Sequence, residues 1–487
     1  MILFLIISIL LLVLFLFVRK SRYWKSRGIP GPRPLPLVGN YGANIIGKKS
    51  SFEISGDIYK QYEDYPFVGV FRMGNPCLLL RDPEIIKNVL VKDFSHFVNN
   101  DIFVDKKLDP LLGRNPFVLK DEEWKKTRQL LTPGFAPAKI NTFFPLVETI
   151  AKNFVKYLER QEDTALNVKD ICGRYTCDTV AICAFGLEGN SFEQPQSQFL
   201  QIVRKFVSPD SLQSIKLAIT LFVPHFKIKI LPKSFDDDVI NITKEILKYR
   251  QENNIKRNDY FDTMTGMSDG ALLEAAGHLS GFILDGYETT SSAMTFMLYE
   301  LAANPKCQQK LREEINAVIE KCNGEFSYDA LKDMAYLEAC INESLRIHPP
   351  LAQLTKTCNK SYTFSTISPE FKKISVTLEP GSSLVVPLLG LQKDPKYFPS
   401  PEKFIPERFL DKSDPHKYVF MPFGTGPRTC LGSRFGLLQS KVGIAMLIKN
   451  FEISLDEKMQ RPLKYDPMYF LLNPKGAAWV KFKKISK

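Results

Sequence analysis

The fold of this chain is decided by residues 423–432, Phe-Gly-Thr-Gly-Pro-Arg-Thr-Cys-Leu-Gly. Two glycines and a proline precede Cys430, and the apolar pattern of a helix follows at about residues 435–450. Glycine lets a backbone pass close to a flat ligand. A cysteine at the beginning of a helix is favoured as the thiolate, the form that binds metals. The stretch therefore predicts that Cys430 is a metal ligand. The alternative for the cysteine alone is an inert buried thiol in a tight turn.

The composition is that of an ordinary globular protein. The chain has 487 residues, of which 44% are hydrophobic and 24% are charged, and no repeat divides its middle. Its net charge is +12 at pH 7, but the Lys and Arg residues are dispersed, so nucleic acid is the weakest partner that a basic protein suggests. Nine cysteines and five histidines are scattered without paired spacing, so we expect neither a zinc site nor a disulfide framework.

The N-terminus has the pattern of a membrane anchor. Residues 1–18, MILFLIISILLLVLFLFV, are apolar apart from one serine, and as a helix they would span about 27 Å, close to the roughly 30 Å of a bilayer core. Basic residues follow at once, which predicts a cytoplasmic location for the rest of the chain. A cleavable signal peptide is the alternative, but its basic start and small-residue cleavage site are missing. We predict an anchor at 1–18, a basic, proline-rich hinge at 19–36 and a catalytic domain at 37–487.

The body of the chain predicts a mainly α protein with small β-sheets. Residues 66–82 alternate around turn residues and indicate a hairpin, residues 374–390 indicate short strands around a Pro-Gly turn, and the tail to residue 487 looks strand-rich. A long helix should run from about residue 269 to 303. Its three interior glycines indicate close approach of another group or a local opening. Strands and helices do not alternate regularly, so a dinucleotide-binding fold has little support.

The stretch at 423–432 resembles the haem-binding signature of the cytochrome P-450 family, Phe-Gly-x-Gly-x-Arg-x-Cys-x-Gly, at every defined position. The N-terminal anchor and hinge resemble those of microsomal members, and LTPGF at 131–135 is similar to animal detoxification members, especially insect ones. The resemblance implies the cytochrome P-450 fold over nearly the whole chain. Further family motifs occur in the family's order: Trp124-x-x-x-Arg128, Glu343-x-x-Arg346 and Phe404–Phe409 with Arg408.

The resemblance also implies roles for the matching residues. Cys430 would be the axial thiolate ligand of haem b, a ligation that favours O–O cleavage. Phe423 would screen the sulfur from water, and Gly424 would let the loop pass close to the cofactor. Glu343 and Arg346 share a helix face. The residues implied to hold the haem propionates are Trp124, Arg128, Arg428 and Lys356. Lys356 stands at a position where members of the family usually have an arginine. The residues implied to lock the cysteine loop are Glu343, Arg346 and Arg408.

Oxygen activation is implied for the long helix. Glu288 and Thr289 match the family's acid–alcohol pair, in which the acid feeds protons and the alcohol steadies the oxygen ligand. Asp285 departs from the pattern, because the family usually has a small apolar residue there, against the haem face. A carboxylate buried without a partner costs several kcal/mol. We therefore expect Asp285 to have a partner, to be protonated or to point elsewhere.

The implied reaction inserts one atom of O2 into a lipophilic substrate, a xenobiotic or an endogenous lipid. Electrons would come from NADPH through a membrane-bound flavoprotein reductase, at the endoplasmic reticulum membrane with the catalytic domain on its cytoplasmic face. Residues 96–119 and 203–235 would form substrate walls, the second as a lid dipping into the membrane or as a core helix pair. The basic residues expected to meet the reductase are Lys125, Lys126, Arg428 and Arg434.

Two other functions are compatible with parts of the sequence. A haem-thiolate isomerase or dehydratase would rearrange peroxides without a reductase, but it needs no relay of the Glu288–Thr289 kind. A non-catalytic haem-binding or ligand-carrying membrane protein is the second, and Asp285 is the local reason to consider it. Reductase-dependent NADPH consumption with product formation distinguishes both from a monooxygenase.

Overall fold

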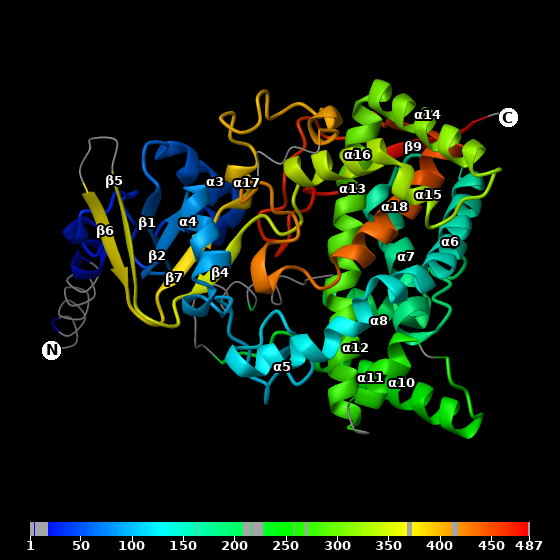
Figure 1. Ribbon diagram of the computed structural model, residues 1–487, viewed down its shortest axis with the longest axis horizontal. Helices are drawn as coiled ribbons and strands as arrows, with labels where there is room; N and C mark the ends of the chain where they lie inside the picture. The colour runs from blue at the N-terminus through cyan, green and yellow to red at the C-terminus, as the bar shows by residue number, and fades with distance from the viewer. Residues whose placement is uncertain are drawn as a thin grey trace.

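The computed structural model describes residues 4, 18–161, 163–207, 216, 227–257, 259–267, 271–367, 373–411 and 417–485. The described chain is mostly helical, with three small sheets. Most helices gather in one half of the molecule and most strands in the other (Figure 1). The prediction of a mainly α protein with small β-sheets is confirmed.

The largest sheet has four strands in the order β1-β2-β7-β4. β1 (Phe67–Arg72) and β2 (Asn75–Leu80) pair antiparallel across a two-residue turn in which both residues have positive φ, as predicted for the hairpin at 66–82. β7 (Ser383–Val386) runs parallel to β2, and β4 (Leu354–Thr357) is antiparallel to β7. β7 therefore brings a distant part of the sequence into register with the hairpin.

Two smaller sheets complete the strand content. β5 (Tyr362–Ile367) and β6 (Lys373–Leu378) form a hairpin, and the third sheet has the order β3-β9-β8. The strands predicted at 374–390 are β6 and β7, which flank the Pro-Gly turn but belong to different sheets. The predicted strand-rich tail holds two strands at its ends. The bounds of the third sheet are β3 (Leu166–Asn167), β8 (Phe451–Leu455) and β9 (Trp479–Lys484).

The helical core surrounds α18 (Ser433–Asn450), which confirms the helix predicted at 435–450. α6 (Pro137–Glu159) packs along α18 and turns inward apolar side chains that recur every three or four residues. α7 (Val168–Val180) and α16 (Ala335–Ile347) pack on the same core. One further pair of helices, α12 and α13, is described below. The other α-helices of the described residues are α2 (Gly42–Ile45), α3 (Ser51–Gln61), α4 (Pro83–Lys87), α5 (Asp121–Leu131), α8 (Gln198–Val207), α10 (Lys233–Glu252), α11 (Tyr260–Met267), α14 (Pro305–Lys321), α15 (Ala330–Asp333) and α17 (Leu388–Leu391).

The long helix predicted at 269–303 is two helices. α12 (Leu272–Gly286) and α13 (Glu288–Ala303) meet at Tyr287, and α14 begins at Pro305, as the proline predicts. The two helices cross the centre of the helical half (Figure 1). The break lies directly after the third glycine of α12, so the local opening indicated by the glycines is present.

The N-terminal part packs on the larger sheet where it is described. The Trp24 indole N–H donates to the Val70 carbonyl at 2.9 Å, and the Gly69 N–H donates to the Pro30 carbonyl at 2.8 Å. The anchor predicted at 1–18 lies almost entirely outside the described residues. Within the described part of the chain, no helix combines the length and the apolar character needed to cross a bilayer.

Candidate functional site: the cysteine loop and the α12–α13 break

The cysteine loop is a turn closed by its own backbone. The Cys430 N–H donates to the Phe423 carbonyl at 2.8 Å. Gly424 and Gly426 have φ values of 68° and 71°, in the left-handed region that favours glycine. Gly426 also lies against Leu90, whose carbonyl oxygen would be 2.0 Å from an added Cβ. Two glycines are therefore required to place the thiol just before α18.

Cys430 and Asp285 lie on the wall of an internal space. Both side chains are accessible to solvent, yet burial is the largest cause of the raised pKa of each, to about 11 for Cys430 and to about 6 for Asp285. A side chain that is accessible but surrounded by protein lines a cavity. The Asp285 charge also raises the pKa of Cys430, so the two groups interact across this space.

The thiolate of Cys430 is not favoured by the helix alone. A backbone N–H at Gly432 lowers the pKa of the thiol, but burial outweighs it. The Gly432 N–H thus acts in the direction expected near a helix N-terminus, and burial acts against it, since the thiol lies three residues before α18. A bound metal displaces the proton instead.

Cys430 is a single strong ligand. Among the described residues, no group of three or more His, Cys, Asp or Glu side chains converges as a metal site. A bare ion needs several protein ligands, whereas haem iron takes four from its macrocycle and needs only an axial one. The donor set fits haem.

Four cations beside the loop fit the propionates of haem. Lys356 is only 3% exposed, and its ammonium has no hydrogen-bond partner among the described residues. Burial, with repulsion from Arg428 and Lys120, lowers the pKa of Lys356 to about 7. Burial also lowers the pKa of Arg428 to about 9, that of Lys120 to about 8 and that of Arg128. None of these four cations forms an ion pair within the described chain. The two propionate carboxylates of haem would therefore offset the large cost of removing these cations from water.

Arg428 also fastens the predicted substrate wall to the cysteine loop. Its guanidinium donates to the carbonyls of Val98, Pro116 and Leu119 at 3.0, 2.8 and 2.8 Å. It stacks over the Trp124 ring at 4.0 Å. Three donors of Arg428 are thus bound inside the protein, whereas Lys125, Lys126 and Arg434 are exposed.

Arg128 contacts the cysteine loop directly. Its guanidinium donates to the Thr429 carbonyl at 2.7 Å, one residue before Cys430. Arg128 and Trp124 both lie on α5, four residues apart, as the motif predicts. The structure therefore brings both motif residues to the same side of the loop.

The Glu343–Arg346 pair is fully buried. Arg346 donates to both carboxylate oxygens of Glu343 at 2.7 and 2.8 Å, and both side chains are 0% exposed. Arg408 donates to the same carboxylate at 3.3 Å. Arg346 also donates to the Gln392 carbonyl at 2.9 Å, while the Gln392 side chain accepts from the Met421 N–H at 3.3 Å. The network thus connects α16 to the segment that enters the cysteine loop.

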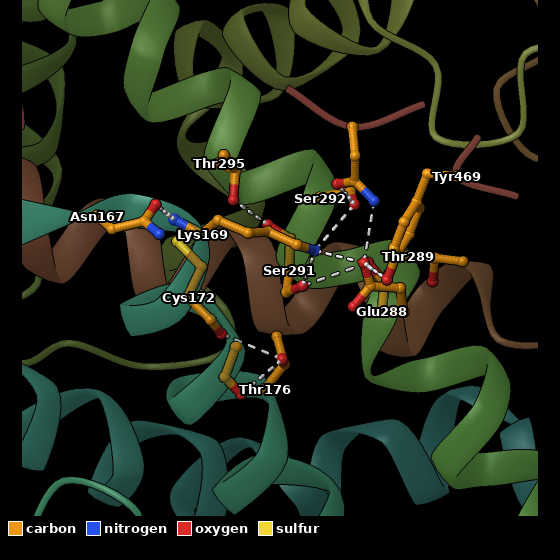
Figure 2. Close-up of polar contacts among 12 residues, drawn as sticks. Asn167, Lys169, Cys172, Thr176, Glu288, Thr289, Ser291, Ser292, Thr295 and Tyr469 are labelled. Carbon is orange, nitrogen blue, oxygen red and sulfur yellow. Dashed lines mark hydrogen bonds and ion pairs between the residues drawn. The ribbon is translucent and has the colours of Figure 1, made fainter. Parts of the chain in front are cut away.

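Glu288 lies in a buried polar cluster between α13 and α7. Figure 2 shows the Lys169 side chain reaching from α7 to the Glu288 carboxylate. The Lys169 ammonium donates to Glu288 Oε1 at 2.5 Å and to the Ser291 hydroxyl at 2.8 Å. The Tyr469 hydroxyl and the Asn473 amide donate to the same oxygen at 2.8 and 3.1 Å. Glu288 Oε2 is buried without a partner in the described chain, which leaves one oxygen for a water or a proton.

Thr289 lies at the helix break. Its hydroxyl donates to the Asp285 carbonyl at 2.6 Å, a bond that competes with the helix backbone. Figure 2 shows Glu288 and Thr289 as neighbours at the start of α13. The structure brings the acid and the alcohol to the end of α12, but the acid is tied to Lys169.

Asp285 has a hydrogen-bond partner, which is one of the three situations expected for it from the sequence. The Asn115 amide donates to Asp285 Oδ2 at 3.0 Å. An added Cβ on Gly281 would be 3.6 Å from the Asn115 amide nitrogen, an ordinary contact distance. One turn earlier, an added Cβ on Gly277 would be 2.6 Å from Arg114. Gly277 therefore makes room for the wall at 96–119. Most of the second expected wall, 203–235, lies outside the described residues.

Sequence reasoning missed Lys120, Asn115 and Lys169. Each is an isolated residue in no motif, and each meets its partner only through the fold. Lys169 and Glu288 are 119 residues apart, so no local spacing indicates the pair. Lys120 and Lys169 each stand next to an aspartate in sequence, so neither differs from an ordinary surface lysine.

A family model described as Cytochrome P450 matches residues 29–480. Cytochrome P450 6j1 of Blattella germanica is 34% identical, over 97% of this chain and 96% of the relative. Probable cytochrome P450 6a23 of Drosophila melanogaster is 34% identical, over 98% of this chain and 97% of the relative. Cytochrome P450 9e2 of Blattella germanica is 30% identical over 97% and 96%. These matches show that the chain, with its cysteine loop and the cations beside it, belongs to the cytochrome P450 family and is a monooxygenase.

Proposed function

We propose that this monooxygenase uses haem b with Cys430 as the axial thiolate and acts on lipophilic substrates, xenobiotics or endogenous lipids. The single observation that carries the proposal is the buried, unpartnered Lys356 ammonium beside Arg428, Lys120 and Arg128. Such a cluster is costly alone and complements two propionates. Haem, when bound, supplies the redox iron at which O2 is reduced.

The protein residues have separate tasks in this proposal. Trp124, Arg128, Arg428 and Lys356 orient the cofactor, and Phe423 and Gly424 shape the loop under it. Glu288 feeds protons to the α12–α13 break, and the Thr289 hydroxyl passes them toward the internal space. The residues that keep the cysteine loop in place are Glu343, Arg346 and Arg408.

The remaining assignments rest on the sequence. Residues 1–18 anchor the chain in the endoplasmic reticulum membrane, residues 19–36 are the hinge and residues 37–487 form the cytoplasmic catalytic domain. NADPH supplies electrons through a flavoprotein reductase. The exposed Lys125, Lys126 and Arg434 offer a basic surface on the cysteine side, suited to an acidic partner.

The test is the carbon monoxide difference spectrum of the reduced protein. The red-shifted thiolate band is expected for the wild type and for the control Cys322→Ala, which removes a cysteine outside the site. Cys430→Ala is expected to lose the band. A normal band in Cys430→Ala would contradict the ligand assignment. Reductase-dependent NADPH consumption with product formation then separates a monooxygenase from an isomerase or a haem carrier.

A further inference from the structure

Asp285 places an acid on the wall of the internal space that also contains Cys430. It lies in the last turn of α12, two residues before Tyr287. Its side chain is accessible although protein surrounds it, and its charge acts on Cys430. A ligand in this space therefore meets a carboxylate.

The carboxylate is held in one orientation by a rigid partner. Asn115 is buried, and its side-chain oxygen accepts from the Phe117 N–H at 2.7 Å. Its amide is therefore fixed in direction and donates to Asp285 Oδ2 at 3.0 Å. No described residue donates a hydrogen bond to Asp285 Oδ1. One oxygen is therefore fixed by the protein and the other is free for a ligand.

No described cation forms an ion pair with Asp285. Tyr260, whose pKa the Asp285 charge raises, and the buried Phe282 lie in the surroundings. The pKa of Asp285 is raised to about 6, mainly by burial, while the Asn115 bond lowers it. The group is thus mostly ionised at neutral pH in surroundings that stabilise a charge poorly. An uncompensated carboxylate of this kind favours a cationic ligand.

We propose that Asp285 is a specificity-determining residue that selects lipophilic substrates carrying an ammonium group. This inference rests on the proposed function, because the internal space is taken as the substrate site. The apolar part of such a substrate lies in the rest of the internal space, and its cation lies against Asp285. Neutral substrates of the same shape gain no such interaction and bind more weakly.

The experiment compares two ligands of equal shape on the full-length holoprotein. The probes are (4-phenylbutyl)trimethylammonium and its neutral carbon isostere, (5,5-dimethylhexyl)benzene. The quaternary nitrogen has no lone pair and cannot bind iron. Dissociation constants are measured at pH 7.5 from the change in the haem absorption spectrum, after the reduced carbon monoxide band has been recorded for each protein.

We expect the wild type to bind the cation at least about tenfold more tightly than the isostere, as a charge pair in surroundings of low polarity predicts. Asp285→Asn and Asp285→Ala are each expected to lose this preference. The charge control Glu313→Gln, on the exposed face of α14, is expected to keep it. If the carbon monoxide band is normal but the wild type does not prefer the cation, the inference is overturned and the proposed function stands. The same conclusion follows if Asp285→Asn has a normal band and an unchanged preference. A missing band in the wild type would instead overturn the proposed function.

Discussion

Lys169 and Glu288 form an ion pair between α7 and α13, with the ammonium 2.5 Å from the carboxylate. The Glu288 side chain is 0% exposed and the Lys169 side chain 22%. The acid of the acid–alcohol pair is therefore held by a cation in the protein interior, and that cation reaches solvent.

Replacing Lys169 by Met should leave the Glu288 carboxylate without its cation. We expect a loss of about 2–3 kcal/mol in the free energy of unfolding, below the range for a fully buried pair because Lys169 is partly exposed. Loss of the cation that holds Glu288 in place should also lower the fraction of NADPH electrons recovered in product. Lys169→Arg should keep both properties, and Lys152→Met, which removes an exposed pair with Glu148, should cost less than about 1 kcal/mol. Equal stability of the Met and Arg variants at position 169 would contradict the role of the charge.

Thr289→Ala should increase the release of hydrogen peroxide per NADPH consumed, because the hydroxyl that would pass a proton into the internal space is lost. Thr289→Ser keeps the hydroxyl and should stay close to the wild type. The measurement is the peroxide yield together with product yield at saturating reductase. Unchanged coupling in Thr289→Ala would remove this residue from the relay.

Arg346→Lys should weaken the fold and the retention of haem together. Lysine cannot bind both oxygens of Glu343, so a buried carboxylate is left poorly paired. We expect a loss of about 3–5 kcal/mol in the free energy of unfolding, measured by denaturant titration. Arg408→Lys, whose contact with Glu343 is longer and partly exposed, should cost less. An Arg408 effect as large as that of Arg346 would show that the assignment of the main pair is wrong.

Lys356→Met should have opposite effects with and without haem. In the haem-free protein the pKa of Lys356 is about 7 instead of 10.5. Between these values the unfolded chain binds more protons, so stability rises with pH in that window and the penalty is largest below about pH 7. Removing the amine should therefore stabilise the haem-free protein by about 1–3 kcal/mol at pH 7, with the gain shrinking toward pH 10.

With haem bound, the same variant should lose the cofactor faster. Transfer of haem to a scavenging apoprotein measures this, and Lys360→Met, a nearby lysine outside the cation cluster, is the control. A variant that retains haem as well as the wild type would argue against a propionate at Lys356.

The cysteine loop, the Glu343–Arg346 pair and the hairpin at 66–82 were predictable because each depends on neighbours in sequence. Fixed spacing places their side chains on one turn or one helix face. The break at Tyr287 was indicated only as an opening among glycines. At this break the Thr289 hydroxyl bonds to the Asp285 carbonyl, a contact that the glycine pattern does not indicate.

The parts that were not predictable depend on contacts between distant segments. Asn115 meets Asp285 across 170 residues, and Lys169 meets Glu288 across 119. Arg428 was assigned from its motif to a propionate, yet three of its donors bind the carbonyls of another segment. A motif identifies which residue type stands at a position. The partners that the residue finds are decided by packing.

The bonds from Arg428 to Val98, Pro116 and Leu119 all end on main-chain oxygens. Every amino acid supplies such an oxygen, so the attachment does not depend on which side chains the attached segment carries. Mutations between these points can change the surface offered to a ligand while the segment stays in place. Substitutions in this segment can therefore change which ligands it contacts without loss of the bonds that hold its backbone in place.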